Sequence, residues 1–590
     1  MKRLALVLFA LAFLSYPLGA SDDDRHDRRG GHHRTFSLVE ATIDQLQDAL
    51  ERGTISSEQL VNKYMARIDE YEGLINAFIY VNPDAAREAR ALDRLRRHMH
   101  GKPDSPLFGI PVLLKDNINT KDMPTTAGSV AFERSLPPPR DAFITRKLRR
   151  AGAIILGKAT LTEFANFIAV GMPTGYSSLG RFGFNPYDPR LDPRPVAPFN
   201  DGRPVLGTGG SSSGSGIGVA ANLVTVAVGT ETSGSILSPG TANNIVGIKP
   251  TLGLVSRRGI LPITADQDTA GPLARTVADA AILLGEIAGF DFKDRATWAC
   301  LIPGKCFSDY TKFLKRNALR GARIAVPRNP YWGGFFNFTT NTPSNPDQYQ
   351  IMIDAIEVLR SKGAFVADPY EIPNQADINN FGICTTTKDP VPPATPCSIV
   401  LAYGQKAHLN AYLEDRPNAP VRTLADIIAF NAGHPVPAIA LKYGQAIFQF
   451  AQSLDTSPGS ADTLRYMQDR QKDLDLTRTG LDAVFNGPDG RKGTRDDFDA
   501  ILFPRNNGAG APAKAGYPSI VVPGGFAPAV LNPPPPAGFT PEPVPFGVTF
   551  SGRAFSEPTL IALAYAYEQA THHRRPPEST PPLPTDVVRR

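Results

Sequence analysis

The chain has 590 residues, of which 42% are hydrophobic and 20% are charged, and its formal net charge is +5 at pH 7. These values are ordinary for a water-soluble globular protein. The charge balance is too small to favour nucleic acid or a charged membrane surface as a partner.

The first 20 residues have the pattern of a secretory signal peptide. Lys2 and Arg3 precede the apolar run 4–14, which is too short to span a membrane, and Leu18-Gly19-Ala20 can serve as a cleavage site. An uncleaved membrane anchor is the alternative. Cleavage after residue 20 removes two positive charges, so the net charge falls from +5 to +3. We therefore expect an exported protein, periplasmic or extracellular, without membrane contact after cleavage and with a disordered N-terminus over residues 21–37.

Helical periodicity is clearest just after this segment. Capping boxes at Thr42 and Ser56, followed by apolar residues at helical spacing, predict two amphipathic helices separated at Gly53. A third helix is expected over residues 85–100.

Short apolar runs further on alternate with helical patterns, which is typical of an α/β fold built on a mostly parallel sheet with helices on its faces. The expected strands lie at residues 110–114, 323–326, 499–504 and 519–523, and the expected helices at residues 277–289, 347–363 and 559–571. Residues 152–164 are expected to form a strand, a turn and the start of a helix.

Three segments of the C-terminal half carry separate expectations. Residues 375–475 are mainly helical in pattern. The loop 486–497 reads NGPDGRKGTRDD, which either holds Ca²⁺ or, without the EF-hand pattern, is a solvated turn. The basic, Pro-rich residues 573–590 are expected to be a disordered tail.

The four cysteines, Cys300, Cys306, Cys384 and Cys397, allow three disulfide connectivities. An even count in an exported protein favours disulfides. We predict the local pairs Cys300–Cys306 and Cys384–Cys397, because each closes a short loop. No Cys/His spacing typical of a metal site is present, so no metal site is predicted.

Two Gly/Ser-rich turns stand out in the middle of the chain. Residues 207–218 and 230–235 flank an apolar, β-branched run at 224–228. Glycine-rich turns bring backbone close to a ligand and leave N–H groups uncovered, so they can bind an anion. A flexible linker is the alternative, but a buried-strand pattern would not interrupt a linker.

These turns resemble the signature of the amidase signature family of Ser-Ser-Lys hydrolases. Gly209-Gly210-Ser211-Ser212 matches the first family turn, and residues 229–236 match the second. Gly109-Ile110-Pro111-Val112-Leu113-Leu114-Lys115-Asp116-Asn117 matches the motif that supplies the lysine. The separation 235 − 211 = 24 also matches the family spacing. From residue 229 to 289 the chain is most similar to bacterial peptide amidases.

The resemblance implies a single α/β amidase domain over residues 38–572, with a large, mostly parallel mixed β-sheet core covered by helices on both faces. Residues 375–475 correspond to the part that varies within the family and that faces the substrate. Ser235 matches the nucleophile, Ser211 the middle residue on a cis peptide bond, and Lys115 the base.

For this chemistry, burial must lower the pKa of Lys115 from about 10.4. The base would then accept the proton of Ser235 through Ser211. The candidate oxyanion donors are the backbone N–H groups of the second turn, Thr232, Ser233, Gly234 and Ser235. The chain departs from the family pattern at Glu231, Ser233 and Leu237, where Asp, Gly and Arg are usual.

We therefore predict a secreted enzyme that hydrolyses a carboxamide C–N bond through an acyl-enzyme, without a cofactor. C-terminal peptide amides are the favoured substrates, and small aliphatic or aryl amides and fatty-acid amides are alternatives. The resemblance also includes the glutamine-hydrolysing component of tRNA amidotransferases, which export disfavours. Expected partners are a small-molecule or short-peptide amide, with no nucleic acid, and the protein is expected to be a monomer or homodimer.

Two further interpretations compete with this one. Gly210-Ser211-Ser212-Ser213-Gly214 also fits the nucleophile elbow of α/β-hydrolases, which would make Ser212 the nucleophile of an esterase. The residues before it are loop-like, and no downstream His has a recognisable triad context. A secreted binding protein with this fold but without catalysis would be expected to lack a triad residue, whereas all three are present.

Overall fold

The computed structural model describes residues 35–99, 102–388 and 396–589. The predicted signal peptide and residues 21–34 lie outside this part. In the described residues, no helix is long and apolar enough to cross a membrane.

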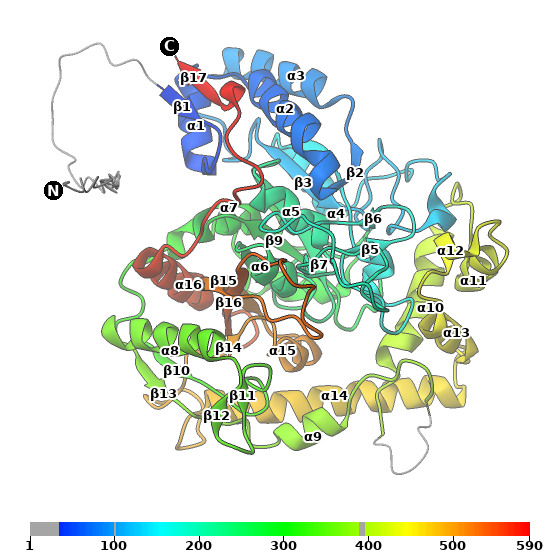
Figure 1. Cartoon of the computed structure of the whole chain (residues 1–590), viewed down its shortest axis with the longest axis vertical. Coiled ribbons are helices and arrows are strands. Elements are labelled where there is room, and N and C mark those ends of the chain that lie inside the picture. The colour runs from blue at the N-terminus through cyan, green and yellow to red at the C-terminus, as the bar shows by residue number, and fades with distance from the viewer. Residues whose placement is uncertain (1–34, 100–101, 389–395, 590) are drawn as a thin grey trace, which may run out of the picture.

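An eleven-stranded sheet runs through the centre of the molecule (Figure 1). From one edge to the other, its strands are β13 (Phe365–Ala367), β10 (Arg323–Ala325), β14 (Ala500–Pro504), β16 (Val544–Ser551), β15 (Ser519–Ala527), β8 (Val246–Lys249), β9 (Thr269–Ala274), β7 (Val226–Glu231), β3 (Pro111–Lys115), β4 (Ile154–Ala159) and β2 (Phe78–Val81). Most of these strands are buried apolar runs, as expected for a sheet covered on both faces.

The sheet is mixed, as predicted. Among the described strands, the four pairs β10–β13, β10–β14, β3–β4 and β3–β7 are parallel, and the other six neighbouring pairs are antiparallel. The antiparallel pairs lie mainly in the middle, where β7, β9, β8, β15, β16 and β14 follow one another. Parallel neighbours are therefore concentrated towards the two edges.

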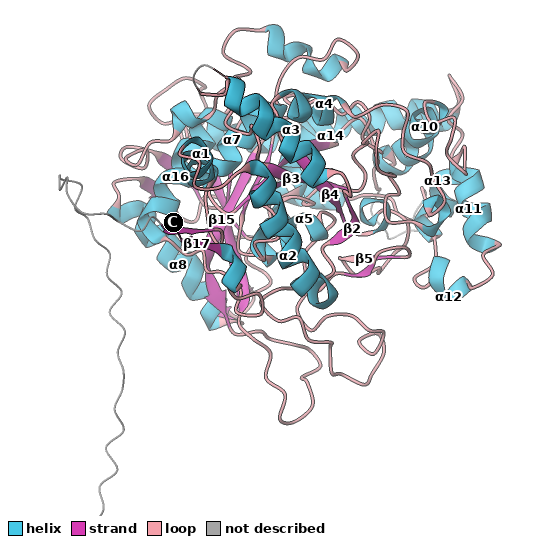
Figure 2. Cartoon of the chain, turned by 90° about the horizontal axis from the view of Figure 1, so that it is seen from above, coloured by secondary structure: helices cyan, strands magenta, loops and turns pink. Residues whose placement is uncertain are grey.

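Helices lie on both sides of this sheet (Figure 2). One group, α5 and α6, contacts β7, β8 and β9, and a second group, α7, α8 and α16, contacts β8, β9 and β15. The helices in chain order are α1 (Ile43–Glu51), α2 (Ser57–Ile75), α3 (Ala85–His98), α4 (Phe143–Arg150), α5 (Ser213–Ala220), α6 (Leu237–Ala242), α7 (Val277–Ile287), α8 (Pro346–Ser361), α9 (Gln375–Asn380), α10 (Val400–Glu414), α11 (Leu424–Ala432), α12 (Pro437–Ala440), α13 (Ala446–Ser453), α14 (Ala461–Phe485), α15 (Gly510–Ala515) and α16 (Glu557–Thr571).

The segment predicted to vary and to face the substrate forms a helical lobe at one side of the molecule, where α10 to α13 gather beside β5 (Tyr176–Ser177) and β6 (Arg181–Phe182) (Figure 1). Its apolar residues form a hydrophobic cluster separate from the sheet core, together with residues from 127–182 and 261–263. Phe164, for example, packs edge-on against Phe448 of α13. This lobe is thus joined to the segments that precede the Gly/Ser turns.

Both predicted capping boxes are present at the starts of α1 and α2, with Thr42 and Ser56 as the caps. Both predicted disulfides, Cys300–Cys306 and Cys384–Cys397, are also formed. The expected helix start near residue 164 is wrong, because Phe164, Ala165 and Asn166 have φ angles of 45°, 56° and 71°. A right-handed helix cannot continue through that left-handed turn.

The expectation of a disordered tail is wrong for residues 573–589. β17 (Val587–Arg589) pairs with β1 (Thr35–Ser37), so the last residues of the expected disordered N-terminus are also ordered. Asp586 accepts a 2.6 Å hydrogen bond from Arg67 of α2, and both side chains are fully buried. Composition misled here because one buried ion pair and one strand pairing can anchor an otherwise polar, Pro-rich segment.

The loop 486–497 has the character of a solvated turn. The Asp497 carboxylate accepts hydrogen bonds from the N–H groups of Gly493 and Thr494 within the same loop. Nowhere in residues 35–99, 102–388 and 396–589 do three or more His, Cys, Asp or Glu side chains gather so that they could hold a metal ion.

Candidate active site

The structure brings Lys115, Ser211 and Ser235 to one end of two neighbouring strands. Lys115 is the last residue of β3, and Ser235 lies in the turn between β7 and α6. β3 and β7 are parallel, with Leu114 opposite Val228, so their carboxyl ends meet at the same edge. Ser211 lies in the turn that leads into α5, and α5 contacts both strands. The three residues therefore come from separate segments that the sheet register places together.

Lys115 has no exposed surface, yet its amine is surrounded by polar partners. Its Nζ lies 2.7 Å from the Ser211 Oγ, 2.8 Å from the Thr230 Oγ1 and 3.2 Å from the Thr230 carbonyl oxygen. Burial lowers the pKa of Lys115 to about 7, and the negative charges of Asp268 and Glu231 oppose part of that fall. A substantial fraction of this lysine is thus neutral, and able to accept a proton, near neutral pH.

The first Gly/Ser turn places its two serines differently. The peptide bond between Gly210 and Ser211 is cis, and the Ser211 carbonyl accepts a 3.0 Å hydrogen bond from the Thr162 N–H. The Ser212 hydroxyl is buried and lies 2.6 Å from the Ser235 carbonyl oxygen and 3.1 Å from that of Thr230. Ser211 therefore faces the lysine, whereas Ser212 clamps the second turn.

These contacts argue against Ser212 as an elbow nucleophile. Its hydroxyl is engaged by backbone carbonyls, and no strand directly precedes the turn, because residues 205–212 are irregular. The α/β-hydrolase interpretation requires such a strand. By contrast, in the part of the chain that the structure describes, the Ser235 hydroxyl makes no hydrogen bond to another protein group, and the residue is 8% exposed.

The Glu231 carboxylate organises the second turn from within. One of its oxygens accepts the Gly234 N–H at 2.7 Å, and the other accepts the N–H groups of Ile236 (2.7 Å) and Leu237 (3.1 Å). The Gly234 N–H is therefore not available as an oxyanion donor, which corrects the sequence-based expectation. The N–H groups of Thr232, Ser233 and Ser235 have no protein acceptor among the described residues, and Ser233 is exposed.

A buried ion pair supports the end of β3. Asp116 and Lys158 are fully buried, with the Asp116 Oδ1 2.8 Å from the Lys158 Nζ. Asp116 also accepts from the N–H and hydroxyl of Thr126, and burial lowers the pKa of Lys158. The Asp116 charge is thus neutralised by Lys158, and Asp116 does not act as the counter-ion of Lys115.

Three supporting residues were missed by sequence reasoning: Asp268, whose carboxylate accepts from the Thr232 hydroxyl at 2.5 Å, Asn117, whose Nδ2 donates to the Thr230 Oγ1 at 3.0 Å, and Ser212. Asn117 and Ser212 stand inside the quoted motifs, so the motifs themselves were the available signal. Asp268 had no comparable signal, because its partner is 36 residues away.

Comparison with known proteins agrees with this site. A profile of the amidase family matches residues 59–388, which are 330 of the 590 residues. The chain belongs to the amidase family. This amidase is 36% identical to a probable amidase of Arabidopsis thaliana over 92% of each chain. It is 32% identical to a putative amidase of Schizosaccharomyces pombe, over 92% of this chain and 88% of the relative.

Among solved structures, the amidase resembles the native peptide amidase of Stenotrophomonas maltophilia. The TM-score is 0.73 at 37% sequence identity, and the match covers 92% of this chain and 99% of that one. The resemblance confirms the predicted fold class, a large mixed sheet covered by helices. Together these matches identify an enzyme that hydrolyses amides.

Proposed function

We propose that this amidase cleaves carboxamide C–N bonds with Ser235 as the nucleophile, Ser211 as the proton relay and Lys115 as the base. The observation that carries the proposal is the 2.7 Å contact between the buried Lys115 amine and the Ser211 hydroxyl, next to the turn that presents Ser235. A serine hydroxyl becomes an effective nucleophile only when a neighbouring group takes its proton.

In the proposed acylation, neutral Lys115 takes the Ser211 proton while Ser211 takes the proton of Ser235. The Ser235 oxygen bonds to the amide carbon, and the carbonyl oxygen becomes an oxyanion. The N–H groups of Thr232, Ser233 and Ser235 would stabilise that charge, and loss of one such donor typically costs about 3–4 kcal/mol. The proton then returns along the same route to the amide nitrogen, and the C–N bond breaks.

In the proposed deacylation, water takes the place of Ser235 as the attacking group. A water molecule gives its proton to the same relay and its oxygen to the acyl carbon. The Ser235 ester bond breaks, which releases a carboxylic acid and restores the hydroxyl. Because the nitrogen leaves before water attacks, ammonia or a small amine should appear before the acid.

We propose C-terminal peptide amides as the substrate class, because the amidase is similar along nearly its whole length to a peptide amidase. The helical lobe formed by α10 to α13 is the part expected to select the acyl side. Small aliphatic or aryl amides and fatty-acid amides are the alternatives. Export through residues 1–20 is also part of the proposal, and the mass of the mature protein tests it, because cleavage after Ala20 leaves Ser21 as the first residue.

The first experiment treats the purified enzyme with a fluorophosphonate and locates the adduct by intact mass and peptide mapping. We expect one adduct, on Ser235, in the wild type and none in Ser235→Ala. An adduct on Ser212, or wild-type turnover by Ser235→Ala, would refute the assigned nucleophile. Ammonia release is then compared for peptide amides, the matching N-methyl amides and acyl amides of increasing chain length. Release confined to the long-chain acyl amides would exclude the peptide class.

A further inference from the structure

Thr232, one of the proposed oxyanion donors, is held by the two residues that directly precede β9, Gln267 and Asp268. Its hydroxyl donates to the Asp268 Oδ1 at 2.5 Å, and its carbonyl oxygen accepts from the Gln267 Nε2 at 3.3 Å. The antiparallel register of β7 and β9 pairs Glu231 with Thr269, so Thr232 and Asp268 are the next residues beyond that pair. The two contacts hold both the side chain and the carbonyl of Thr232.

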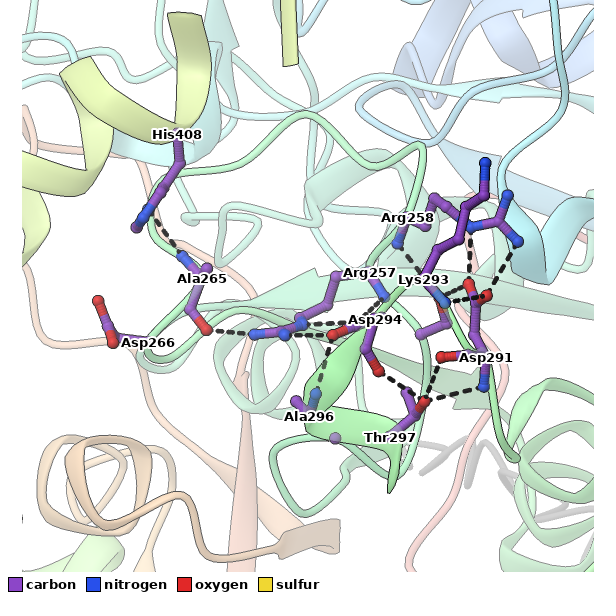
Figure 3. A network of polar contacts seen from close by, with 12 residues as sticks. Arg257, Arg258, Ala265, Asp266, Asp291, Lys293, Asp294, Ala296, Thr297 and His408 are labelled. Carbon is purple, nitrogen blue, oxygen red and sulfur yellow. Dashed lines mark hydrogen bonds and ion pairs between the residues drawn. The ribbon is translucent and has the colours of Figure 1, made fainter. Parts of the chain in front are cut away.

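The Asp268 carboxylate is itself held firmly in place. Its second oxygen accepts the N–H groups of Ile263 at 2.8 Å and Thr264 at 3.0 Å. Ala265, which lies between Thr264 and Asp268 in the chain, is fixed by two further hydrogen bonds. Its N–H donates to the His408 Nδ1 at 3.1 Å, and its carbonyl accepts from Arg257 (Figure 3). Asp268 is therefore a rigid support, because a carboxylate bonded at both oxygens has little freedom to rotate.

Asp268 lines a small cavity together with Thr230, which accepts a hydrogen bond from the Lys115 amine. The polar lining residues of this cavity include Asn117, Glu231 and Arg257, and apolar residues such as Ile260 and Leu261 complete the wall. The Thr230 hydroxyl oxygen lies 2.8 Å from the Lys115 Nζ, so a single side chain separates the Lys115 amine from the cavity that Asp268 lines.

The other charged groups around this cavity already have partners. Glu231 binds the N–H groups of its own turn, and Arg257 pairs with Asp294 at 2.5 Å (Figure 3). Further from the cavity, His408 of α10 accepts from the Ala265 N–H, and the neighbouring Asp266 pairs with Arg470. Next to Lys115 in the chain, Asp116 forms an ion pair with Lys158.

Burial raises the pKa of Asp268 to about 6, so its carboxylate is largely ionised at neutral pH. This negative charge raises the pKa of Lys115 and so offsets part of the lowering that burial causes.

We propose that Asp268 is a positioning residue of this hydrolytic site, which fixes the oxyanion turn through Thr232 and stabilises the protonated form of Lys115 through its charge. This inference rests on the proposed roles of Ser235 and Lys115. It gives one carboxylate two effects that separate variants can tell apart.

The test measures the rate of fluorophosphonate labelling of Ser235 between pH 5 and pH 9 in full-length enzyme. In the wild type the labelling rate should rise with pH along an acidic limb and then reach a plateau. For Asp268→Asn we expect this acidic limb to move to lower pH by on the order of one unit, because removal of a nearby opposite charge lowers the pKa of a lysine. We also expect the plateau rate to fall by about tenfold or more, because the amide keeps one acceptor oxygen, so either the Thr232 hydroxyl or the N–H groups of Ile263 and Thr264 lose their acceptor and the oxyanion turn is held less firmly. Thr232→Val should lower the plateau without moving the limb, and Thr232→Ser, which keeps the hydroxyl, should restore it.

Asp266→Asn is the matched control, since its carboxylate lies in the same loop but binds Tyr466 and Arg470 instead of the turn. Its limb and plateau should stay within about twofold of the wild type. An Asp268→Asn limb at the wild-type pH, or an equal shift in Asp266→Asn, overturns the charge effect. A Thr232→Val plateau equal to that of the wild type overturns the positioning effect, even if Asp268→Asn does not fold. Absence of Ser235 labelling in the wild type would instead refute the proposed function, and this inference with it.

Discussion

The Lys115 amine lies 2.7 Å from the Ser211 hydroxyl oxygen, and neither side chain has exposed surface. A lysine in such a place gives up most of its hydration. Its pKa of about 7, against an ordinary 10.5, corresponds to a cost on the order of 4–5 kcal/mol for charging it inside the protein. Near neutral pH the enzyme therefore holds a substantial fraction of this amine uncharged against a hydroxyl.

The pH dependence of hydrolysis follows from this contact. The proposed base is active when neutral, and the pKa of Lys115 is lowered, so kcat/KM should rise with pH through about 7 and then level off. Lys115→Ala should lose at least about 100-fold in rate at pH 8, the scale of a general-base contribution. The measurement is kcat/KM for an amide substrate from pH 5 to pH 9. A profile that is flat across pH 6–8 would remove Lys115 from the proposed role.

The Ser212 hydroxyl should matter for the shape of the turn and not for bond formation. Ser212→Ala leaves the carbonyls of Ser235 and Thr230 without their shared donor, so we expect a stability loss of about 1–3 kcal/mol. Peptide mapping after fluorophosphonate treatment should still find the adduct on Ser235, formed more slowly. Complete loss of labelling in a variant with native circular dichroism and near-native stability would contradict this assignment.

Glu231 should set the rate through the turn that it caps. Glu231→Gln keeps the size of the side chain but replaces one acceptor oxygen with a donor, so at least one of the N–H groups of Gly234, Ile236 and Leu237 loses its partner. We expect kcat to fall by about 10- to 100-fold with little change in the thermal midpoint. Glu231→Asp, which keeps the charge with a shorter reach, should fall between the two. Equal kcat values for all three enzymes would show that the cap is dispensable.

The C-terminal tail should contribute to global stability. Asp586→Asn leaves the buried Arg67 guanidinium without its counter-charge, and loss of one member of a buried pair typically costs about 3–5 kcal/mol. Urea unfolding at pH 7 measures the change. Glu578→Gln, at an exposed position of the same tail, is the control and should leave the midpoint unchanged. A midpoint for Asp586→Asn that equals the control would mean that the tail is not anchored through this pair.

Glu163 should make the enzyme less stable as the pH rises from 4.5 to 7. Burial raises its pKa from 4.5 to about 7, so over this range the unfolded chain loses the proton while the folded protein retains it. The free energy of unfolding should therefore fall by up to about 3 kcal/mol across that window. Glu163→Gln can still bond the Ser178 N–H and hydroxyl but does not titrate, so its advantage should grow over the same window. Parallel urea midpoints for both proteins from pH 5 to pH 8 would contradict the argument.

Local patterns predicted much of the fold. The capping boxes at Thr42 and Ser56, the buried run that ends at Lys115 and the two Gly/Ser turns all depend on residues close together in the chain. Both disulfides could also be predicted, because each closes a short loop, with separations of 6 and 13 residues. These features depend on residues that lie within a short stretch of the chain, so a local sequence pattern is enough to predict them.

The sequence by itself determined that Lys115, Ser211 and Ser235 stand in motifs of the amidase family, because those motifs are contiguous. Only the tertiary structure decided that Gly234 gives its N–H to Glu231, that Asp268 supports Thr232, and that Asp586 anchors the tail to Arg67. Such contacts depend on strand register and on the direction of individual side chains. The contact between Arg67 and Asp586 joins residues 519 positions apart. Pairings of that kind are set by how the whole sheet closes around its core, and no local pattern encodes them.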